Sequence, residues 1–201
     1  MIKFPSKFFY ISILPSAILY LAILYVSNFY NIKLSLVVRD LAQTCGYPIG
    51  VGMISNLGIL FWGAAASICL FTTFSDSINR ESSKLLLLGG VFSGLLCIDD
   101  LFLLHDRYVG QDFLNLTYLS ISIFLLVRFQ RILKNIGLFN LIISILFLGL
   151  SIFFDGVIQQ IFNQSYELTQ LIEEGFKFLG IICWLNFWCK ASNHALKFGN
   201  L

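Results

Sequence analysis

The chain has 201 residues, of which 58% are hydrophobic and only 12% carry a charged side chain, and its formal net charge is +2. Soluble globular domains contain about 25% charged residues, so this composition excludes an ordinary water-soluble domain. The small net charge and the absence of a Lys/Arg cluster argue against a nucleic-acid-binding protein. We predict an all-α integral membrane protein, a compact bundle of about six transmembrane helices whose partners are membrane lipids and not nucleic acid.

A transmembrane helix needs about 20 largely apolar residues in succession. Several segments approach or exceed this length, and we predict one helix over each of them, at residues 8–30, 51–74, 84–105, 112–133, 136–157 and 171–191. The first segment follows Lys3 and Lys7 and is longer than the apolar core of a cleaved signal sequence, so it is predicted to stay in the protein. No internal repeat or linker interrupts residues 1–201, which we predict to form one multi-pass domain.

The connection between the first two predicted helices, residues 31–50, is long for a helical bundle. It holds an apolar stretch at residues 34–38 and a Gly-Tyr-Pro sequence typical of a turn at residues 46–48. An amphipathic helix lying on the outer face and a structured loop explain these features equally well, and the sequence leaves both alternatives open.

The Lys and Arg residues determine the predicted orientation, because the cytoplasmic loops of membrane proteins are enriched in them. With both termini in the cytoplasm, nine of the 13 basic side chains lie on the inner side, three lie outside and Lys177 lies within the sixth helix. We therefore predict cytoplasmic N- and C-termini. The abundance of Phe, Leu, Ile, Asn and Lys is typical of a low-GC bacterial genome and favours the bacterial inner (plasma) membrane as the location.

Charged side chains interrupt two of the apolar segments, at Asp99 and Asp100 in the third helix and at Lys177 in the sixth. A charge in the hydrocarbon layer costs about 3 kcal/mol even on lenient insertion scales, so it needs a partner or a function. At about 1.5 Å per residue, the two aspartates lie about 22–24 Å from Lys84, and Lys177 lies about 20 Å from Lys190. The two helices run in opposite directions, so these charges are predicted to meet at one level near the outer surface.

We predict that the third, fifth and sixth helices enclose an outward-facing acidic pocket at their outer ends. Its candidate metal ligands are Asp99, Asp100, His105, Asp106, Asp155, Glu173 and Glu174. Carboxylates with one imidazole suit a divalent metal ion, whose identity the sequence does not settle. A bound metal would make a coordinated water a nucleophile toward an ester, amide or phosphate. In that reaction Lys177 would stabilise the developing anion and Ser93 would hydrogen-bond within the site. The first interpretation is therefore a metal-dependent hydrolase of lipid or amphiphilic substrates.

Two other interpretations stay open. In a cation- or proton-coupled transporter or channel, Asp99, Asp100 and Glu174 would carry the ion and Lys177 would supply an internal counter-charge. The apolar inner halves of the third, fifth and sixth helices argue against a continuous path of this kind. In a non-catalytic membrane subunit, acting as a homo-oligomer or with a partner membrane subunit, the same charges would form a structural network.

Overall fold

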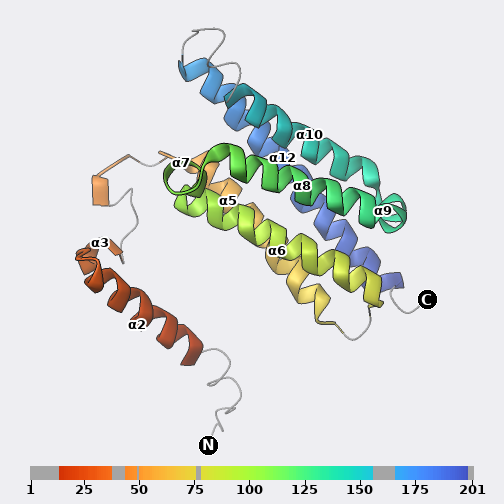
Figure 1. The fold of residues 1–201 in the computed structure, drawn as a ribbon, viewed down its shortest axis with the longest axis horizontal. Helices are drawn as coiled ribbons and strands as arrows, with labels where there is room; N and C mark the ends of the chain where they lie inside the picture. Colours follow the sequence, from red (N-terminus) through yellow and green to blue (C-terminus); the bar gives the residue numbers. More distant parts are fainter. Residues whose placement is uncertain (1–13, 38–43, 49, 76–77, 156–165, 199–201) are drawn as a thin grey trace, which may run out of the picture. The chain divides into compact units, whose positions relative to one another are not determined.

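The computed structural model describes residues 14–37, 44–48, 50–75, 78–155 and 166–198 (Figure 1). Across these residues the regular structure is helical without any β-strand, which confirms the all-α prediction for this part of the chain. The chain divides into two compact units, Met1–Val51 and Gly52–Leu201, and each is described by itself below. The single domain over residues 1–201 stays a prediction.

The first unit contains α2, which spans Leu14–Phe29, and the single-turn helix α3, which spans Leu34–Val37. α2 covers most of the predicted segment 8–30, whose first residues lie outside the described part of the chain. Asn31, just beyond α2, has a positive φ of 56°, a backbone conformation that asparagine tolerates better than most residues. Part of the connection 31–50 is not described, so the choice between amphipathic helix and loop stays open.

The described helices of the second unit are α5 (Met53–Thr73), α6 (Arg80–Phe102), α7 (Leu104–Arg107), α8 (Gln111–Arg128), α9 (Gln130–Ile136), α10 (Leu138–Phe153) and α12 (Tyr166–Phe198). Every segment predicted as a helix between residues 51 and 191 overlaps one or two of them. α12 is the longest, with 33 residues, and it extends beyond both ends of the predicted segment 171–191.

α6 begins earlier than predicted, and both of its ends have local causes. The side chain of Asn79 accepts a hydrogen bond from the backbone N–H of Ser82 at 2.8 Å and caps the first turn. At the other end, Leu103 has a left-handed conformation with a φ of 52°, which stops the helix and redirects the chain into α7. This turn brings His105 back to Asp99, which lies in the last turn of α6.

The predicted helix over residues 112–133 is broken into α8 and α9, whose axes differ in direction by 83°. The prediction of one continuous helix here is wrong. Phe129, at the break, and Leu133, in α9, are 5% and 0% exposed, so the chain at and after the bend packs two apolar side chains into the core. At the same end of α8, Arg128 donates a hydrogen bond to Glu81 of α6 at 2.9 Å.

An aromatic core holds the second unit together where α5 packs along α6 and α12 packs along α5 and α10. The ring centroids of Trp62 and Trp184 are 5.8 Å apart, and those of Trp184 and Trp188 are 5.6 Å apart, both in edge-to-face pairs. All three indoles are at most 2% exposed. Gly89 of α6 makes room for Trp188, because a Cβ atom at this glycine would lie 2.2 Å from the indole ring.

Two helices, α5 and α6, are long and apolar enough to cross a membrane, judged by length and composition. The bent pair α8 and α9 makes a third candidate if it counts as one span. α2 and α10 are apolar but shorter, with 16 residues each. α12 has sufficient length, but Glu173, Glu174 and Lys177 interrupt its apolar sequence. The prediction of six spans therefore stays a prediction.

Candidate functional site

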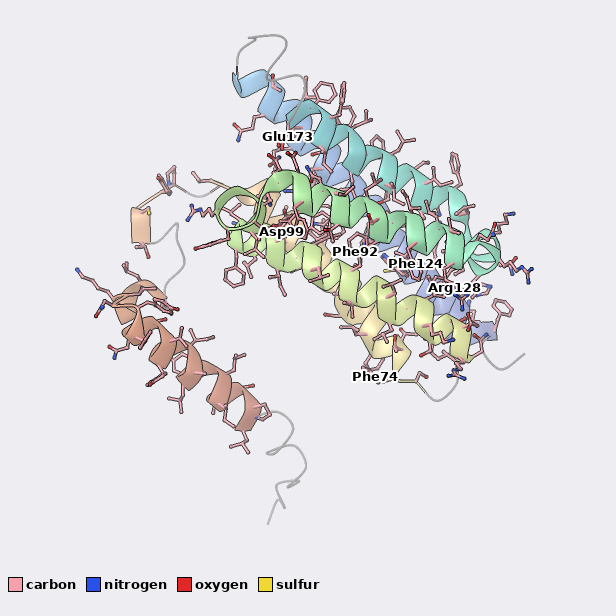
Figure 2. The ribbon with its side chains drawn as sticks, viewed as in Figure 1. Phe74, Phe92, Asp99, Phe124, Arg128 and Glu173 are labelled. Carbon is pink, nitrogen blue, oxygen red and sulfur yellow. The ribbon has the colours of Figure 1, made fainter. Side chains whose placement is uncertain are left out.

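A cavity of about 180 Å³ lies between α6, α8, α10 and α12. The smaller part of its wall is polar or charged and is formed by Asp99, Asp100, His105, Gln111, Asn115, Tyr118, Ser122, Ser151, Asp155, Glu173 and Lys177. The apolar part of the wall is formed by Trp62, Phe92, Leu96, Leu119, Ile145, Leu148, Ile152 and Trp184. In Figure 2, Asp99 and Glu173 are labelled toward one end of the helices and Arg128 toward the other, so the charged wall lies near one end.

The lining residues change from charged to apolar in the same direction along the helices. On α10 the lining runs from Asp155, just beyond the helix end, back to Ile145, and on α12 it runs from Glu173 to Trp184. At about 1.5 Å per residue, these stretches are each about 15–17 Å long. The cavity is therefore elongated along the helices, with a charged end and an apolar end. Concave sites of this kind, mostly apolar with a few convergent polar groups, are typical of small-molecule binding.

Asp99 is the most deeply buried charged group of the cavity wall, with 5% of its surface exposed. Its Oδ1 accepts hydrogen bonds from the backbone N–H of His105 at 2.9 Å and lies 3.0 Å from the same residue's Nδ1. Its Oδ2 accepts a hydrogen bond from the hydroxyl of Tyr118 at 2.9 Å. These donors compensate for the burial of the carboxylate. They also fix the imidazole against Asp99, so that α6, α7 and α8 meet at one carboxylate.

Asp100 forms an ion pair with Lys177, whose Nζ lies 2.8 Å from Oδ1, while Trp62 Nε1 donates to Oδ2 at 3.0 Å. The Lys177 side chain is 25% exposed and that of Asp100 is 11% exposed. This contact confirms the prediction that α6 and α12 bring opposite charges to one level. A second, much smaller cavity of about 10 Å³ lies against the same pair and is also lined by Ser55 and Glu174.

The other predicted metal ligands lie in different places. Asp155 and Glu173 line the main cavity, and the side-chain amide of Gln111 donates a hydrogen bond to Asp155. Glu174 lines the small cavity on the other side of the ion pair. The side chain of Asp106 lies outside the described part of the structure. The cavity thus gathers most, but not all, of the predicted set.

Ser93, predicted to hydrogen-bond within the site, is completely buried and is not part of the described cavity wall. Its hydroxyl donates to the carbonyl oxygen of Gly89 at 2.8 Å and accepts a hydrogen bond from Trp184 Nε1 at 2.8 Å. Through this contact Ser93 orients an indole that does line the cavity. Its predicted catalytic role stays a prediction.

Among the residues that the structure describes, Asp99, Asp100 and His105 have the geometry to hold a metal ion, because one ligand atom from each lies within 4.8 Å of the others. The donor types suit a divalent cation. However, all four carboxylate oxygens already accept hydrogen bonds or pair with the ammonium. A metal would therefore have to displace protein donors, the Lys177 ammonium among them.

The sequence did not point to the polar face of α8, which carries Gln111, Asn115, Tyr118 and Ser122 into the cavity wall. Their spacing of four, three and four residues places them on one side of a helix, and this period is the signal that could have identified them. The indoles of Trp62 and Trp184 carry no such signal. Each sits on an apolar helix, where packing against other apolar side chains is the usual role.

A protein-family model described as "Domain of unknown function (DUF8692)" matches residues 15–191. The chain belongs to this family. The match begins in α2 and ends in α12, and it includes every residue of both cavities. No curated protein and no solved structure matches the chain.

Proposed function

We propose that this chain is a multi-pass protein of the bacterial inner membrane that hydrolyses an amphiphilic substrate in its cavity, with His105 as general base. The observation that carries the proposal is the hydrogen-bonded Asp99–His105 pair at the charged end of a cavity whose other end is lined mainly by apolar side chains. A substrate with a polar head and an apolar body matches both parts of this wall. Its scissile bond lies beside His105 and its body extends toward Trp184.

The apolar surface of the second unit supports the membrane setting. α5 and α6 satisfy the length and composition of membrane spans. Phe71 and Phe74, near the end of α5, are 82% and 80% exposed, and exposed apolar side chains occur on each of the long helices. Exposed apolar side chains on every long helix suit contact with the acyl chains of lipids. We therefore retain six spans, with both termini in the cytoplasm, as part of the proposal.

The role of His105 follows from its contact with Asp99. An ionised Asp99 carboxylate can only accept a hydrogen bond, so we assign the proton of the neutral imidazole to Nδ1 and the lone pair to Nε2. In the proposed reaction Nε2 takes a proton from a water molecule as the water oxygen attacks an acyl carbon. The same proton then passes to the departing oxygen or nitrogen of the substrate. Asp99 keeps the ring in place and stabilises the imidazolium, as a carboxylate does in other hydrolases.

Lys177 supplies the positive charge that this reaction needs. Its ammonium has three N–H donors and uses one toward Asp100. Because Lys177 also lines the cavity, another donor stabilises the oxyanion that forms when water attacks. The Asp100 carboxylate holds the Lys177 ammonium, and Trp62 holds that carboxylate, so both groups are in position before the substrate binds.

Metal-assisted hydrolysis in the same cavity is a second candidate, favoured by the compact group Asp99, Asp100 and His105. Metal content measured by mass spectrometry on the detergent-purified chain separates the two forms. One divalent ion per chain, lost in Asp100→Asn, would support the metal-assisted form. The metal-free form predicts activity that survives exhaustive chelation.

The experiment that tests the proposal is an esterase assay on the purified chain in detergent, with p-nitrophenyl esters of increasing acyl length as probes. His105→Gln should lower kcat/KM by about 10²–10⁴-fold, the usual contribution of a general base. The matched control is His194→Gln, because His194 is the second of two histidines and packs on Phe198 at a centroid distance of 4.9 Å, far along α12. Equal activity in the two variants would refute the proposal.

A further inference from the structure

The cavity also reaches the surface at an apolar place, away from its charged end. Leu119 of α8 and Ile152 of α10 both line the cavity, yet they are 53% and 41% exposed. Gly149 of α10 lines the cavity and is exposed as well. A residue that belongs to both the cavity wall and the outer surface marks a place where the cavity opens. These three residues lie on the facing sides of α8 and α10.

The packing of the helices leaves space at this opening. α10 packs along α12, whereas α8 has its main contacts with α6, α7 and α9. The hydrogen bond from Gln111 to Asp155 joins α8 to the region just beyond α10 at the charged end. Farther along, a Cβ atom added to Gly149 would meet no heavy atom within 4 Å. The gap thus lies at the level of Gly149, about 9 Å along the axis of α10 from Asp155 and its hydrogen bond with Gln111.

We propose that one acyl chain of a membrane lipid enters the cavity sideways through the gap between α8 and α10 at Gly149. This inference rests on the proposed function for the membrane setting and for the position of the head group beside His105. It deepens that proposal by naming the substrate class, which is a bilayer lipid and not an amphiphile dissolved in water.

The size of the cavity supports a lateral opening. An apolar cavity of about 150 Å³ holds one benzene molecule, so a cavity of about 180 Å³ is too small for a whole lipid. With the gap, only the part of the lipid nearest the scissile bond needs to fit inside. The rest of the chain stays among the acyl chains of the bilayer, whose hydrocarbon layer is about 30 Å thick and includes the level of Gly149 in the proposed orientation.

The test uses the full chain in phosphatidylcholine vesicles whose acyl chains carry bromine atoms, which quench tryptophan fluorescence at short range. Trp62 and Trp184 line the cavity but are 2% and 1% exposed, so a brominated chain inside the cavity adds quenching to that caused by the surrounding lipid. Gly149→Leu places a side chain in the gap and should remove this additional quenching. Gly149→Ala should remove a smaller part of it.

Gly94→Leu is the matched control, because Gly94 of α6 also has open space around its Cβ position but does not line the described cavity. It should leave the quenching at the wild-type level. Equal quenching in wild type and both Gly149 variants, or an equal loss in Gly94→Leu, would overturn the lateral opening. His105→Gln in the same vesicles should lose lipid hydrolysis and keep the wild-type quenching, which separates the two proposals. Quenching in the wild type that depends on Gly149, without any hydrolysis by the wild type, would support the opening and refute the hydrolase.

Discussion

Lys177→Met tests how much the protein depends on the partly buried ion pair between Lys177 and Asp100. The substitution removes the ammonium but keeps a long apolar side chain, so Asp100 loses its counter-charge while 11% exposed. Removing one partner of a buried pair costs about 3–5 kcal/mol. The lower end of this range applies, because the pair borders a cavity and Asp100 still accepts a hydrogen bond from Trp62. We therefore expect a loss of about 3 kcal/mol in the free energy of unfolding.

Thermal unfolding in detergent, followed by tryptophan fluorescence, measures this loss. For a chain of this length, 1 kcal/mol corresponds to about 2–4 °C in Tm, so Lys177→Met should lower Tm by about 6–12 °C. The control is Lys84→Met, which breaks an exposed pair with Glu81 whose side chains are 46% and 44% exposed. Exposed pairs contribute about 0–1 kcal/mol, so the control should lower Tm only slightly.

A second variant shows whether the uncompensated charge causes the loss. Asp100→Asn removes the negative charge and keeps an oxygen that can accept the hydrogen bond from Trp62. Combined with Lys177→Met, it should recover most of the lost stability, because no buried charge remains unpaired. The reasoning fails if Lys177→Met is no worse than Lys84→Met, or if the double variant is as unstable as Lys177→Met alone.

Two other substitutions test the contacts around the cavity. Tyr118→Phe removes one of the donors to the buried carboxylate of Asp99 and should cost about 1–3 kcal/mol in the same unfolding assay. In the esterase assay, it should lower kcat and leave the acyl-length preference unchanged. Unaltered activity and stability would contradict this role of Tyr118. Gly89→Ala should cost about 1–3 kcal/mol or more, because its methyl group would collide with the indole of Trp188 at 2.2 Å. Gly94→Ala, which meets open space, should be nearly neutral, and equal Tm values for the two glycine variants would show that α6 and α12 do not approach as closely as described.

Figure 1 shows how α8 lies between α6 and α10 in this view, and the residues of the cavity wall come from all three helices as well as from α12. α8 contributes its polar face to the cavity but has few contacts with the rest of the unit. An element that is loosely packed and borders a binding cavity is a common place for motion that admits a ligand. The loose packing of α8 therefore suits an opening between α8 and α10 at Gly149, through which the proposed lipid chain would enter.

The level of the charged groups along their helices follows directly from the sequence. A helix rises by a constant amount per residue, so counting from Lys84 and from Lys190 was enough to place Asp100 and Lys177 at one level. The ion pair between them confirms this prediction. Helix positions were predictable for a similar reason, since long apolar segments record where the chain is shielded from water.

The tertiary structure alone decided which side chains face each other. The break after Arg128 depends on whether Phe129 and Leu133 find a buried place in the second unit, which no local pattern reveals. The partners of the aspartates, Trp62 and Tyr118, come from helices whose rotation and neighbours are set by packing. Sequence distance along one helix determines depth, whereas the contacts around a cavity depend on how several helices are turned toward one another. The charges and an acidic pocket between the helices that carry them could therefore be predicted from the sequence. The contribution of α8 to the cavity wall and the apolar end of the cavity could not.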